Sequence, residues 1–363
     1  MRLLLAPDSF KGTLTAAEAA ECMAAGLRPA MPQAEIVCLP LADGGEGTLD
    51  AVLGGCVGQL QRCAARGLDG EWGHAGWGRV VLDGRDTALI EVAQVVGWAG
   101  GSRVPPWQRT TLGVGDLIAA ALEAGVEQIC LALGGTATTD GGLGMLAALG
   151  ARFFAVDGSL LPPFVTLDQP VAQLDLSGPL EKLHRMPLLM LTDVSNPLLG
   201  PEGAAWVFGP QKGLSEPECR RADAWLQALA QAGGHLAEAQ RAGAGAAGGL
   251  GFAGLLLGGT IQPGAQTILR WLDFEQRLNT FDWVVTGEGR TDSTSRHGKL
   301  PFVVAATARR ANKPVALVSG QVEAGLNLAD TFSTVIACQS GPAMPDRLTA
   351  CLRLRDAASR LHL

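Results

Sequence analysis

The sequence predicts an α/β protein with a doubly wound parallel sheet and a second, mixed α/β domain. Two observations lead to this prediction. Short apolar runs, typical of buried strands, recur along the chain, and each ends in a loop where Asp or Glu stands among glycines. Strand and helix patterns alternate at both ends of the chain, whereas the middle has a different character. The apolar runs are Arg2–Ala6, Glu35–Leu39, Ile129–Leu133, Pro187–Leu191 and Phe281–Val285.

The N-terminal elements follow a β-α-β-α order. The strand Arg2–Ala6 is followed by a helix that begins at a capping box, Thr15-Ala16-Ala17-Glu18, and ends near Leu27. The strand Glu35–Leu39 comes next. A second helix begins near Glu46, because a carboxylate is favourable at a helix N-terminus.

The middle of the chain, from Cys56 onwards, loses this alternation. Asp83-Gly84-Arg85-Asp86 predicts a hairpin turn between the strands Arg79–Leu82 and Thr87–Val92. Helices are predicted at Val114–Ala124, Leu143–Leu149 and Pro217–Ala239, the last with Trp225, Leu226, Leu229 and Leu236 on its buried side. The prolines between positions 162 and 179 predict a long irregular connection.

Strand and helix patterns alternate again at the C-terminal end. The expected elements are the strand Phe281–Val285, the helix Pro301–Ala311, the strands Pro314–Val318 and Thr334–Ile336, and the helix Asp346–Leu361. Together with the two N-terminal strands they give a flavodoxin-like sheet. We therefore expect a discontinuous flavodoxin-like domain, residues 1–55 and 278–363, and an inserted mixed α/β domain, residues 56–277, with the active site in the cleft between them.

Composition narrows the function classes. The 363 residues carry a formal net charge of -7 and no basic stripe, which argues against nucleic acid or an anionic membrane as a partner. The 8 cysteines form no CxxC pair, so we expect reduced, mostly buried thiols in a cytoplasmic protein. The uncharged stretch between Arg241 and Arg270 is too rich in glycine for a membrane helix and predicts a buried loop and helix.

Two acidic loops near the N-terminus predict binding of a charged small molecule. In the first, Asp8-Ser9-Phe10-Lys11-Gly12, the lysine and the serine hydroxyl could hold a phosphate or carboxylate. In the second, Asp43-Gly44-Gly45-Glu46, two carboxylates lie in one tight loop and suit Mg²⁺, which takes oxygen ligands. The alternative in each case is a simple turn or helix start.

Three further loops complete the candidate site. The small and hydroxylated residues Gly134-Gly135-Thr136-Ala137-Thr138-Thr139-Asp140 are typical of a phosphate cradle but lack the closing Gly-Lys-Ser/Thr of a Walker A motif. Asp193 could act as a base or form an Asx turn. The loop Gly287-Glu288-Gly289-Arg290-Thr291-Asp292, with Lys299 beyond it, could bind Mg²⁺ and phosphoryl oxygens, or pair its charges internally.

Other enzyme classes lack support. The five histidines do not cluster, and there is no HExxH or GxSxG motif. His297 alone lies near a proposed site loop, where it is more typical of a structural loop residue than of a catalyst.

Taken together, these motifs resemble those of bacterial glycerate kinases of the first class. Besides the five loops, the segment Phe208-Gly209-Pro210-Gln211-Lys212-Gly213 belongs to the resemblance, which extends over nearly the whole chain in the family's order. The resemblance implies phosphorylation of D-glycerate by ATP with Mg²⁺, usually to 2-phosphoglycerate. It also implies a flavodoxin-like domain with a second α/β domain inserted.

The residue roles are hypotheses from side-chain chemistry. Glu288, Asp292 and Glu46 are expected to bind Mg²⁺, and Asp193 to act as the base, with Lys11 and Arg290 as further catalytic residues. The glycerate-binding residues are expected to be Asp8, Ser9, Lys11, Asp43, Gly44, Gly45 and Lys299. The nucleotide-binding residues are expected to be Gly134, Gly135, Thr136, Thr138, Thr139, Asp140 and Gly287.

Several alternatives stay open at this level. They are a kinase for a related hydroxy acid, a glycerate 3-kinase, a Mg²⁺-dependent phosphohydrolase and a ligand-binding protein without turnover. The sequence also leaves both a monomer and a homodimer open.

Overall fold

The computed structural model describes residues 1–97, 104–163, 169–296, 298–338 and 344–363. The chain divides into two compact units. Unit 1 comprises Met1–Cys56 and Pro263–Leu363, and unit 2 comprises Val57–Gln262. Residues 263–277, which the sequence pattern placed in the inserted domain, belong to unit 1.

Unit 1 is built on a five-stranded parallel sheet within its described residues. Its strands lie in the order β13-β12-β11-β1-β2, and every neighbouring pair is parallel. The strands are β1 (Arg2–Leu5), β2 (Glu35–Cys38), β11 (Trp283–Thr291), β12 (Val315–Val322) and β13 (Thr334–Ala337). Counted along this unit alone, the order is 2-1-3-4-5.

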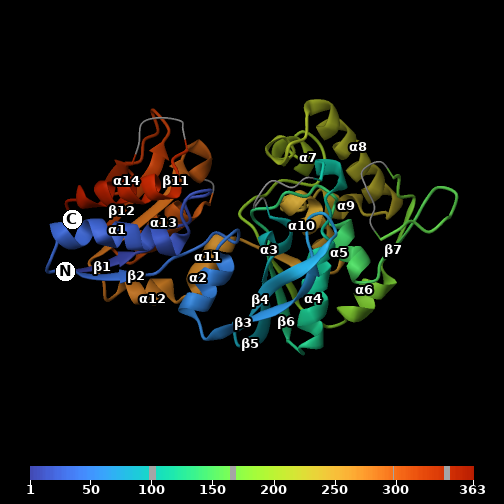
Figure 1. Cartoon of the computed structure of the whole chain (residues 1–363), viewed down its shortest axis with the longest axis horizontal. Helices are drawn as coiled ribbons and strands as arrows, with labels where there is room; N and C mark the ends of the chain where they lie inside the picture. Colours follow the sequence, from blue (N-terminus) through green and yellow to red (C-terminus); the bar gives the residue numbers. More distant parts are fainter. Residues whose placement is uncertain (98–103, 164–168, 297, 339–343) are drawn as a thin grey trace. The chain divides into compact units, whose positions relative to one another are not determined.

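Helices pack on this sheet. The helices of unit 1 are α1 (Ala16–Ala30), α2 (Thr48–Gly55), α11 (Gly264–Trp271), α12 (Phe274–Leu278), α13 (Leu300–Arg310) and α14 (Arg347–Ser359). Helices α1 and α14 lie side by side (Figure 1). Their apolar residues form one buried cluster with β1, β11 and β12, which includes Leu5, Met23, Val285 and Leu354. Helix α13 contacts β11, β12, α11 and α12.

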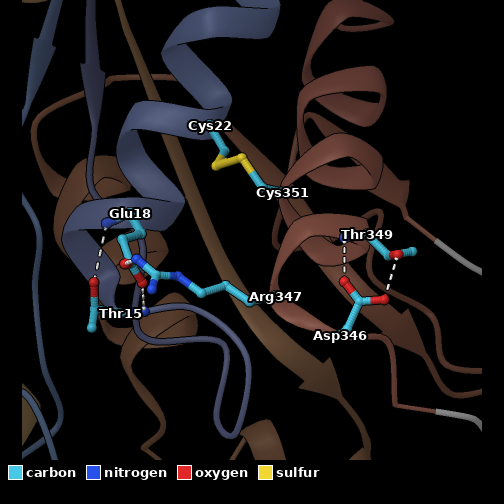
Figure 2. Close-up of a disulfide and its surroundings, with 7 residues drawn as sticks. All are labelled: Thr15, Glu18, Cys22, Asp346, Arg347, Thr349 and Cys351. Atoms are coloured by element: carbon cyan, nitrogen blue, oxygen red, sulfur yellow. Dashed lines mark hydrogen bonds and ion pairs between the residues drawn. A yellow bond between two sulfur atoms is a disulfide. The ribbon is translucent and has the colours of Figure 1, made fainter.

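A disulfide joins α1 to α14 and corrects the expectation of reduced thiols. Cys22 and Cys351 are bonded, with their Cα atoms 5.5 Å apart (Figure 2). An ion pair between Glu18 and Arg347 joins the same two helices. The two cysteines are separated by 329 positions, so their spacing in the sequence held no sign of the pairing.

Unit 2 contains a six-stranded mixed sheet in the order β10-β9-β6-β5-β4-β3, again counting described residues. Its first four strands, β10, β9, β6 and β5, run parallel to one another, and the pairs β5–β4 and β4–β3 are antiparallel. The strands are β3 (Gly58–Arg66), β4 (Trp72–Leu82), β5 (Arg85–Glu91), β6 (Gln128–Ala132), β9 (Leu188–Leu191) and β10 (Thr260–Gln262). The predicted hairpin is confirmed, because β4 and β5 pair around Asp83 and Gly84, both with positive φ.

The remaining elements of unit 2 surround this sheet. They are α3 (Ala93–Val96), α4 (Leu112–Glu123), α5 (Leu143–Ala148), α6 (Ser177–Lys182), α7 (Ala204–Phe208), α8 (Glu216–Ala232), α9 (Leu236–Ala239), α10 (Leu250–Leu256) and the hairpin of β7 (Arg152–Phe154) and β8 (Gln173–Asp175). The single helix predicted at Pro217–Ala239 is wrong. Gly233 and Gly234 end α8, and Leu236 is exposed in α9.

The uncharged stretch before Arg270 folds as a buried loop followed by α10, as the sequence predicted. Among the described residues, no helix is both long and apolar enough to cross a membrane.

The predicted α/β class is confirmed by the two sheets. One is a parallel five-stranded sheet, and the other is a separate mixed six-stranded sheet.

Candidate active site

A pocket of about 400 Å³ lies at the carboxyl ends of the strands of unit 1. It brings together eight residues that the sequence pattern singled out: Asp8, Ser9, Lys11, Asp43, Glu288, Arg290, Asp292 and Lys299. These residues come from four separate segments of the chain. Because the strands are parallel, their carboxyl ends meet at one edge of the sheet, and the pocket forms there.

The loop after β1 supplies Asp8, Ser9 and Lys11. The amide of Asp8 donates to the Gly287 carbonyl of β11 at 2.8 Å, which extends the pairing beyond the end of the strand. The Asp8 carboxylate accepts the Ser9 amide at 2.7 Å. The Ser9 hydroxyl is buried without a hydrogen-bond partner, so it has an unused donor at the pocket wall.

Lys11 lies among carboxylates. Its pKa is raised, chiefly by the negative charge of Asp43 and, against the effect of burial, also by Asp8, Glu46 and Glu288. Burial, together with the charge of Asp43, raises the pKa of Asp8 well above its usual range. An acidic group with so high a pKa at a pocket wall is typical of a functional site, because folding alone does not require a buried charge there.

A hydrogen bond between the Asp43 side chain and the backbone stabilises the loop after β2. Asp43 accepts a hydrogen bond from the Gly45 amide at 3.0 Å, and Gly44 adopts φ +92°. Asp43 lines the pocket, whereas Gly44, Gly45 and Glu46 do not. Glu46 is exposed but lies close enough to raise the pKa of Lys11.

The charged motif from Gly287 to Thr291 lies in strand β11, so the prediction of a loop there is wrong. Pairing with β12 explains this, because it continues along β11 as far as Thr291 opposite Val322. Glu288 is buried, and its carboxylate accepts a hydrogen bond from Thr291 at 2.9 Å. Burial raises the pKa of Glu288, and the nearby charge of Lys299 opposes that rise.

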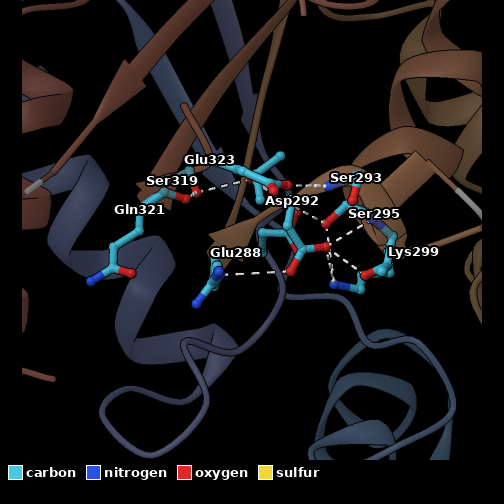
Figure 3. Close-up of polar contacts among 11 residues, drawn as sticks. Glu288, Asp292, Ser293, Ser295, Lys299, Ser319, Gln321 and Glu323 are labelled. Carbon is cyan, nitrogen blue, oxygen red and sulfur yellow. Dashed lines mark hydrogen bonds and ion pairs between the residues drawn. The ribbon is translucent and has the colours of Figure 1, made fainter. Parts of the chain in front are cut away.

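Asp292 and Lys299 form a polar cluster with Ser295 just beyond β11 (Figure 3). The Lys299 amino group lies 3.1 Å from the Ser295 hydroxyl and 3.5 Å from the Asp292 carboxylate. Burial pushes the pKa of Asp292 upward, but hydrogen bonds from Thr294 and the charge of Lys299 outweigh it and lower the pKa. Arg290 is largely exposed, with its Nε atom 3.7 Å from Asp292.

The oxygen donors of this pocket suit Mg²⁺ chemically. Asp43, Glu288 and Asp292 offer hard carboxylate oxygens, and the unpartnered hydroxyl of Ser9 lines the same pocket. Across the described part of the chain, no three acidic, histidine or cysteine side chains are gathered closely enough to hold a metal ion by themselves. In proteins Mg²⁺ usually keeps water and substrate phosphate oxygens among its ligands.

In unit 2 the predicted phosphate loop follows β6, and Asp140 organises it. The buried Asp140 carboxylate accepts hydrogen bonds from the amides of Thr111, Gly142 and Gly144 and from the Thr111 hydroxyl, at 2.8–3.2 Å. Burial raises its pKa in spite of these bonds. Both oxygens of Asp140 are thus used within the protein, and this side chain shapes the loop.

The hydroxyls of Thr138 and Thr139 are buried without hydrogen-bond partners. The glycine-rich segment before α10 packs on this loop, and a Cβ atom at Gly248 would lie 2.0 Å from the Thr138 carbonyl oxygen. Lys212 donates to that same oxygen at 2.6 Å. Burial lowers the pKa of Lys212 to about 7, with Arg109 adding to the effect and Asp140 opposing it.

Asp193 follows β9 at the same edge of the unit 2 sheet as Gly134, Gly135 and Thr136. Strands β6 and β9 are parallel neighbours, with Ala132 opposite Leu191, so the segments after them leave the sheet together. The Asp193 side chain is partly exposed. Hence the predicted site residues form two groups, one in each unit.

Several residues of these sites were missed at the sequence level. Lys212 was part of a recognised motif but had no role assigned. Phe10, which lies within the first acidic loop without an assigned role, lines the unit 1 pocket. Gln321, Met344 and Arg353 line it too, and no pattern in the sequence pointed to them. His297 lies outside the described residues.

Comparisons with known proteins show the family to which the chain belongs. The sequence model of the Glycerate kinase family matches residues 3–361. Glycerate kinase of Bacillus subtilis (strain 168) is 40% identical over 343 residues, covering 90% of this chain and 87% of the relative. Glycerate 2-kinase of Escherichia coli (strain K12) is 37% identical over 328 residues, covering 89% and 86%.

A solved structure extends the match to three dimensions. A crystal structure of a protein assigned as glycerate kinase 2 from Salmonella typhimurium LT2 is 36% identical and superposes with a TM-score of 0.78. The match covers 99% of this chain and 96% of that one. The chain therefore belongs to the glycerate kinase family.

Proposed function

We propose that the protein transfers the γ-phosphoryl group of ATP to D-glycerate in the presence of Mg²⁺, giving 2-phospho-D-glycerate and ADP. Membership of the glycerate kinase family and similarity to a protein named glycerate 2-kinase support this reaction. The structural observation that carries it is the group of Lys11, Lys299 and the acids Asp8, Asp43 and Glu288 around one pocket. Phosphoryl transfer depends mainly on positioning and on neutralising charge, which such a group supplies.

The proposal also includes a more specific assignment of the fold. Unit 1 is a flavodoxin-like domain whose chain is interrupted after α2 by unit 2. The strand order within unit 1, 2-1-3-4-5, supports this assignment.

In the unit 1 pocket, Lys11, Lys299 and Arg290 would hold anionic oxygens of the substrates. Glu288 and Asp292, with Asp43 or Glu46, would hold Mg²⁺, which neutralises phosphate charge when bound. Asp8 and the free hydroxyl of Ser9 would orient the bound substrate.

In unit 2, Asp193 would accept the proton of the reacting hydroxyl of glycerate. As that proton leaves, the hydroxyl oxygen bonds to the γ-phosphorus, and the bond from this phosphorus to the bridging oxygen of ADP breaks. The Gly134–Asp140 segment would contact phosphate oxygens. The unpartnered hydroxyls of Thr138 and Thr139 support a polar ligand there, whereas Asp140 would act by holding the loop in shape.

Phosphorus NMR of the reaction products tests this function. Purified protein is incubated with ATP, Mg²⁺ and D-glycerate, and a parallel sample lacks glycerate. We expect a 2-phosphoglycerate signal in the first sample and intact ATP in the second. A 3-phosphoglycerate signal would overturn the assigned product, and ADP with free phosphate in both samples would indicate a phosphohydrolase instead.

A further inference from the structure

The unit 1 pocket is longer than a phosphoryl site requires. Its lining extends from Asp43, after β2, to Cys338, after β13, so it crosses all five strands of the sheet. Neighbouring strands lie about 4.8 Å apart, which makes this edge roughly 19 Å long. A three-carbon acid occupies a small part of that length, whereas an extended nucleoside triphosphate needs most of it.

Charge is distributed unevenly along the pocket. The strand order places Asp43, Asp8 and Lys11 at the β2 and β1 end. Glu288 on β11 and Asp292 just beyond it lie in the middle. Both lysines that line the pocket, Lys11 and Lys299, belong to segments next to β1 and β11. The phosphate-binding chemistry is therefore concentrated in this part of the pocket.

The β12 and β13 end is mostly apolar. Besides Gln321 and Arg353, its lining residues are Gly320 on β12, Cys338 after β13, Met344 and Pro345 before α14, and Ala350 on α14. Met344 is 70% exposed, so its thioether is accessible to a ligand in the pocket. A thioether of this kind is a favourable contact for an aromatic ring.

The floor of this end carries no side chain. Gly289 and Gly320 lie on the neighbouring strands β11 and β12, and a Cβ atom at Gly320 would lie 2.3 Å from the Gly289 carbonyl oxygen. The group that approaches Gly320 so closely is the backbone of the neighbouring strand, and neither glycine places a side chain over this surface. A flat ring could lie on this surface.

Polar groups suited to a heterocycle stand at the rim. Gln321 offers an amide with both donor and acceptor atoms, and Figure 3 shows its side chain on the side of the cluster away from Lys299. Arg353 of α14 provides a planar guanidinium that can stack on an aromatic ring.

We infer that the β12 and β13 end of the pocket, bounded by Gly320, Gln321, Met344 and Arg353, binds the purine base of ATP. The triphosphate then extends toward Lys299 and Lys11. This inference rests on the proposed function, since it assigns a place to the base of the nucleotide used in that reaction. It identifies Met344 as a specificity residue for the base.

Titration calorimetry with two ligands separates contacts to the base from contacts to the phosphates. ATP carries both parts, and tripolyphosphate carries only the phosphates. The test variant is Met344→Asp, because a carboxylate at this exposed position introduces a hydrated charge against the base without disturbing a packed core. Leu352→Asp is the matched control, since Leu352 is also an exposed apolar residue, 56% exposed on α14, and does not line the pocket.

We expect Met344→Asp to weaken ATP binding at least about tenfold and to leave tripolyphosphate binding unchanged. Leu352→Asp should change neither, and Lys11→Met should weaken both. Unchanged ATP affinity in Met344→Asp, together with weakened affinity in Lys11→Met, would overturn the inference but not the kinase function. If the unmodified protein bound no ATP and formed no phosphoglycerate, the proposed function itself would fail.

Photolabelling gives a second, direct readout. 8-Azido-ATP is irradiated on the unmodified protein, and the labelled peptide is identified by mass spectrometry. Attachment within residues 344–353 supports the inference. Attachment confined to unit 2 overturns it, because the base would then lie outside this pocket.

Discussion

Lys212 donates a hydrogen bond of 2.6 Å from its amino group to the carbonyl oxygen of Thr138, and both residues are buried. The contact joins two segments 74 positions apart and holds the predicted phosphate loop through its backbone. Arg109 reinforces it by donating to the Lys212 carbonyl at 2.9 Å. This buried pair of cations leads to the first prediction.

The stability effect of replacing Lys212 should depend on pH. Burial lowers the pKa of Lys212 to about 7. Below about pH 7 the amino group is buried in its charged form, and there Lys212 destabilises the folded state most. This destabilisation declines as pH rises toward the ordinary value of 10.5. The free energy of unfolding in urea should therefore be compared between Lys212→Met and the unmodified protein. The value for the variant minus the value for the unmodified protein should be more positive at pH 6 than at pH 9. A difference independent of pH would contradict the lowered pKa.

Replacing Asp8 with Asn should stabilise the folded protein while lowering its activity. The pKa of Asp8 is raised, so the folded state retains its proton more firmly and stability falls as pH rises from the ordinary value of 3.8 through the folded value. At pH 8 we expect Asp8→Asn to gain about 1 kcal/mol in the free energy of unfolding, and to lose this gain near pH 4. The Ser9 amide can still donate to the Asn side chain.

The kinetic half of that experiment identifies a functional role. We expect kcat/KM of Asp8→Asn for D-glycerate to fall at least about tenfold while stability at pH 8 rises. A rise in stability with full activity would show that Asp8 does not serve the reaction.

Asp193→Asn tests the assignment of the base. We expect kcat to fall more than about tenfold, equivalent to about 1.4 kcal/mol, because Asn cannot accept the proton of the substrate hydroxyl. Ser195→Ala is a suitable control, since Ser195 is exposed in the same loop. A smaller loss of kcat in a correctly folded Asp193→Asn would assign the proton to another acceptor.

Cys351→Ser tests the disulfide between α1 and α14. Loss of the cross-link should lower the free energy of unfolding by about 2–5 kcal/mol under non-reducing conditions. A reductant should destabilise the unmodified protein by a similar amount and leave Cys351→Ser unchanged. An equal response of both proteins to the reductant would mean that the bond contributes nothing.

Local sequence signals predicted much of the fold. The capping box at Thr15 and Glu18 forms as expected, with α1 beginning at the next residue, Ala16. The turn at Asp83 and Gly84 also forms, because both residues adopt the positive φ that such a turn requires. In these cases the decisive interactions lie within a few residues of one another.

The errors arise where distant segments decide the outcome. Glycines and charges around Glu288 favour a loop locally, yet strand β12 pairs with them and keeps the chain extended. The partners of Lys212 and of Cys22 lie far away along the chain. The charged half of the unit 1 pocket was predictable because acidic motifs follow β1 and β2 and lie at the end of β11. Met344 and Arg353 belong to no such motif, and they join the pocket only through the packing of the C-terminal segment.

The bond between Cys22 and Cys351 turns the inserted unit into part of a covalent ring. Unit 2 leaves unit 1 after Cys56 and returns at Pro263, between the two bonded positions. A protease that cuts the backbone once within unit 2 would thus yield two fragments that stay together on a non-reducing gel and separate only after reduction. Insertion of a foreign domain, or circular permutation within unit 2, would likewise leave the two segments of unit 1 tethered to each other, whatever happens to the connection between them.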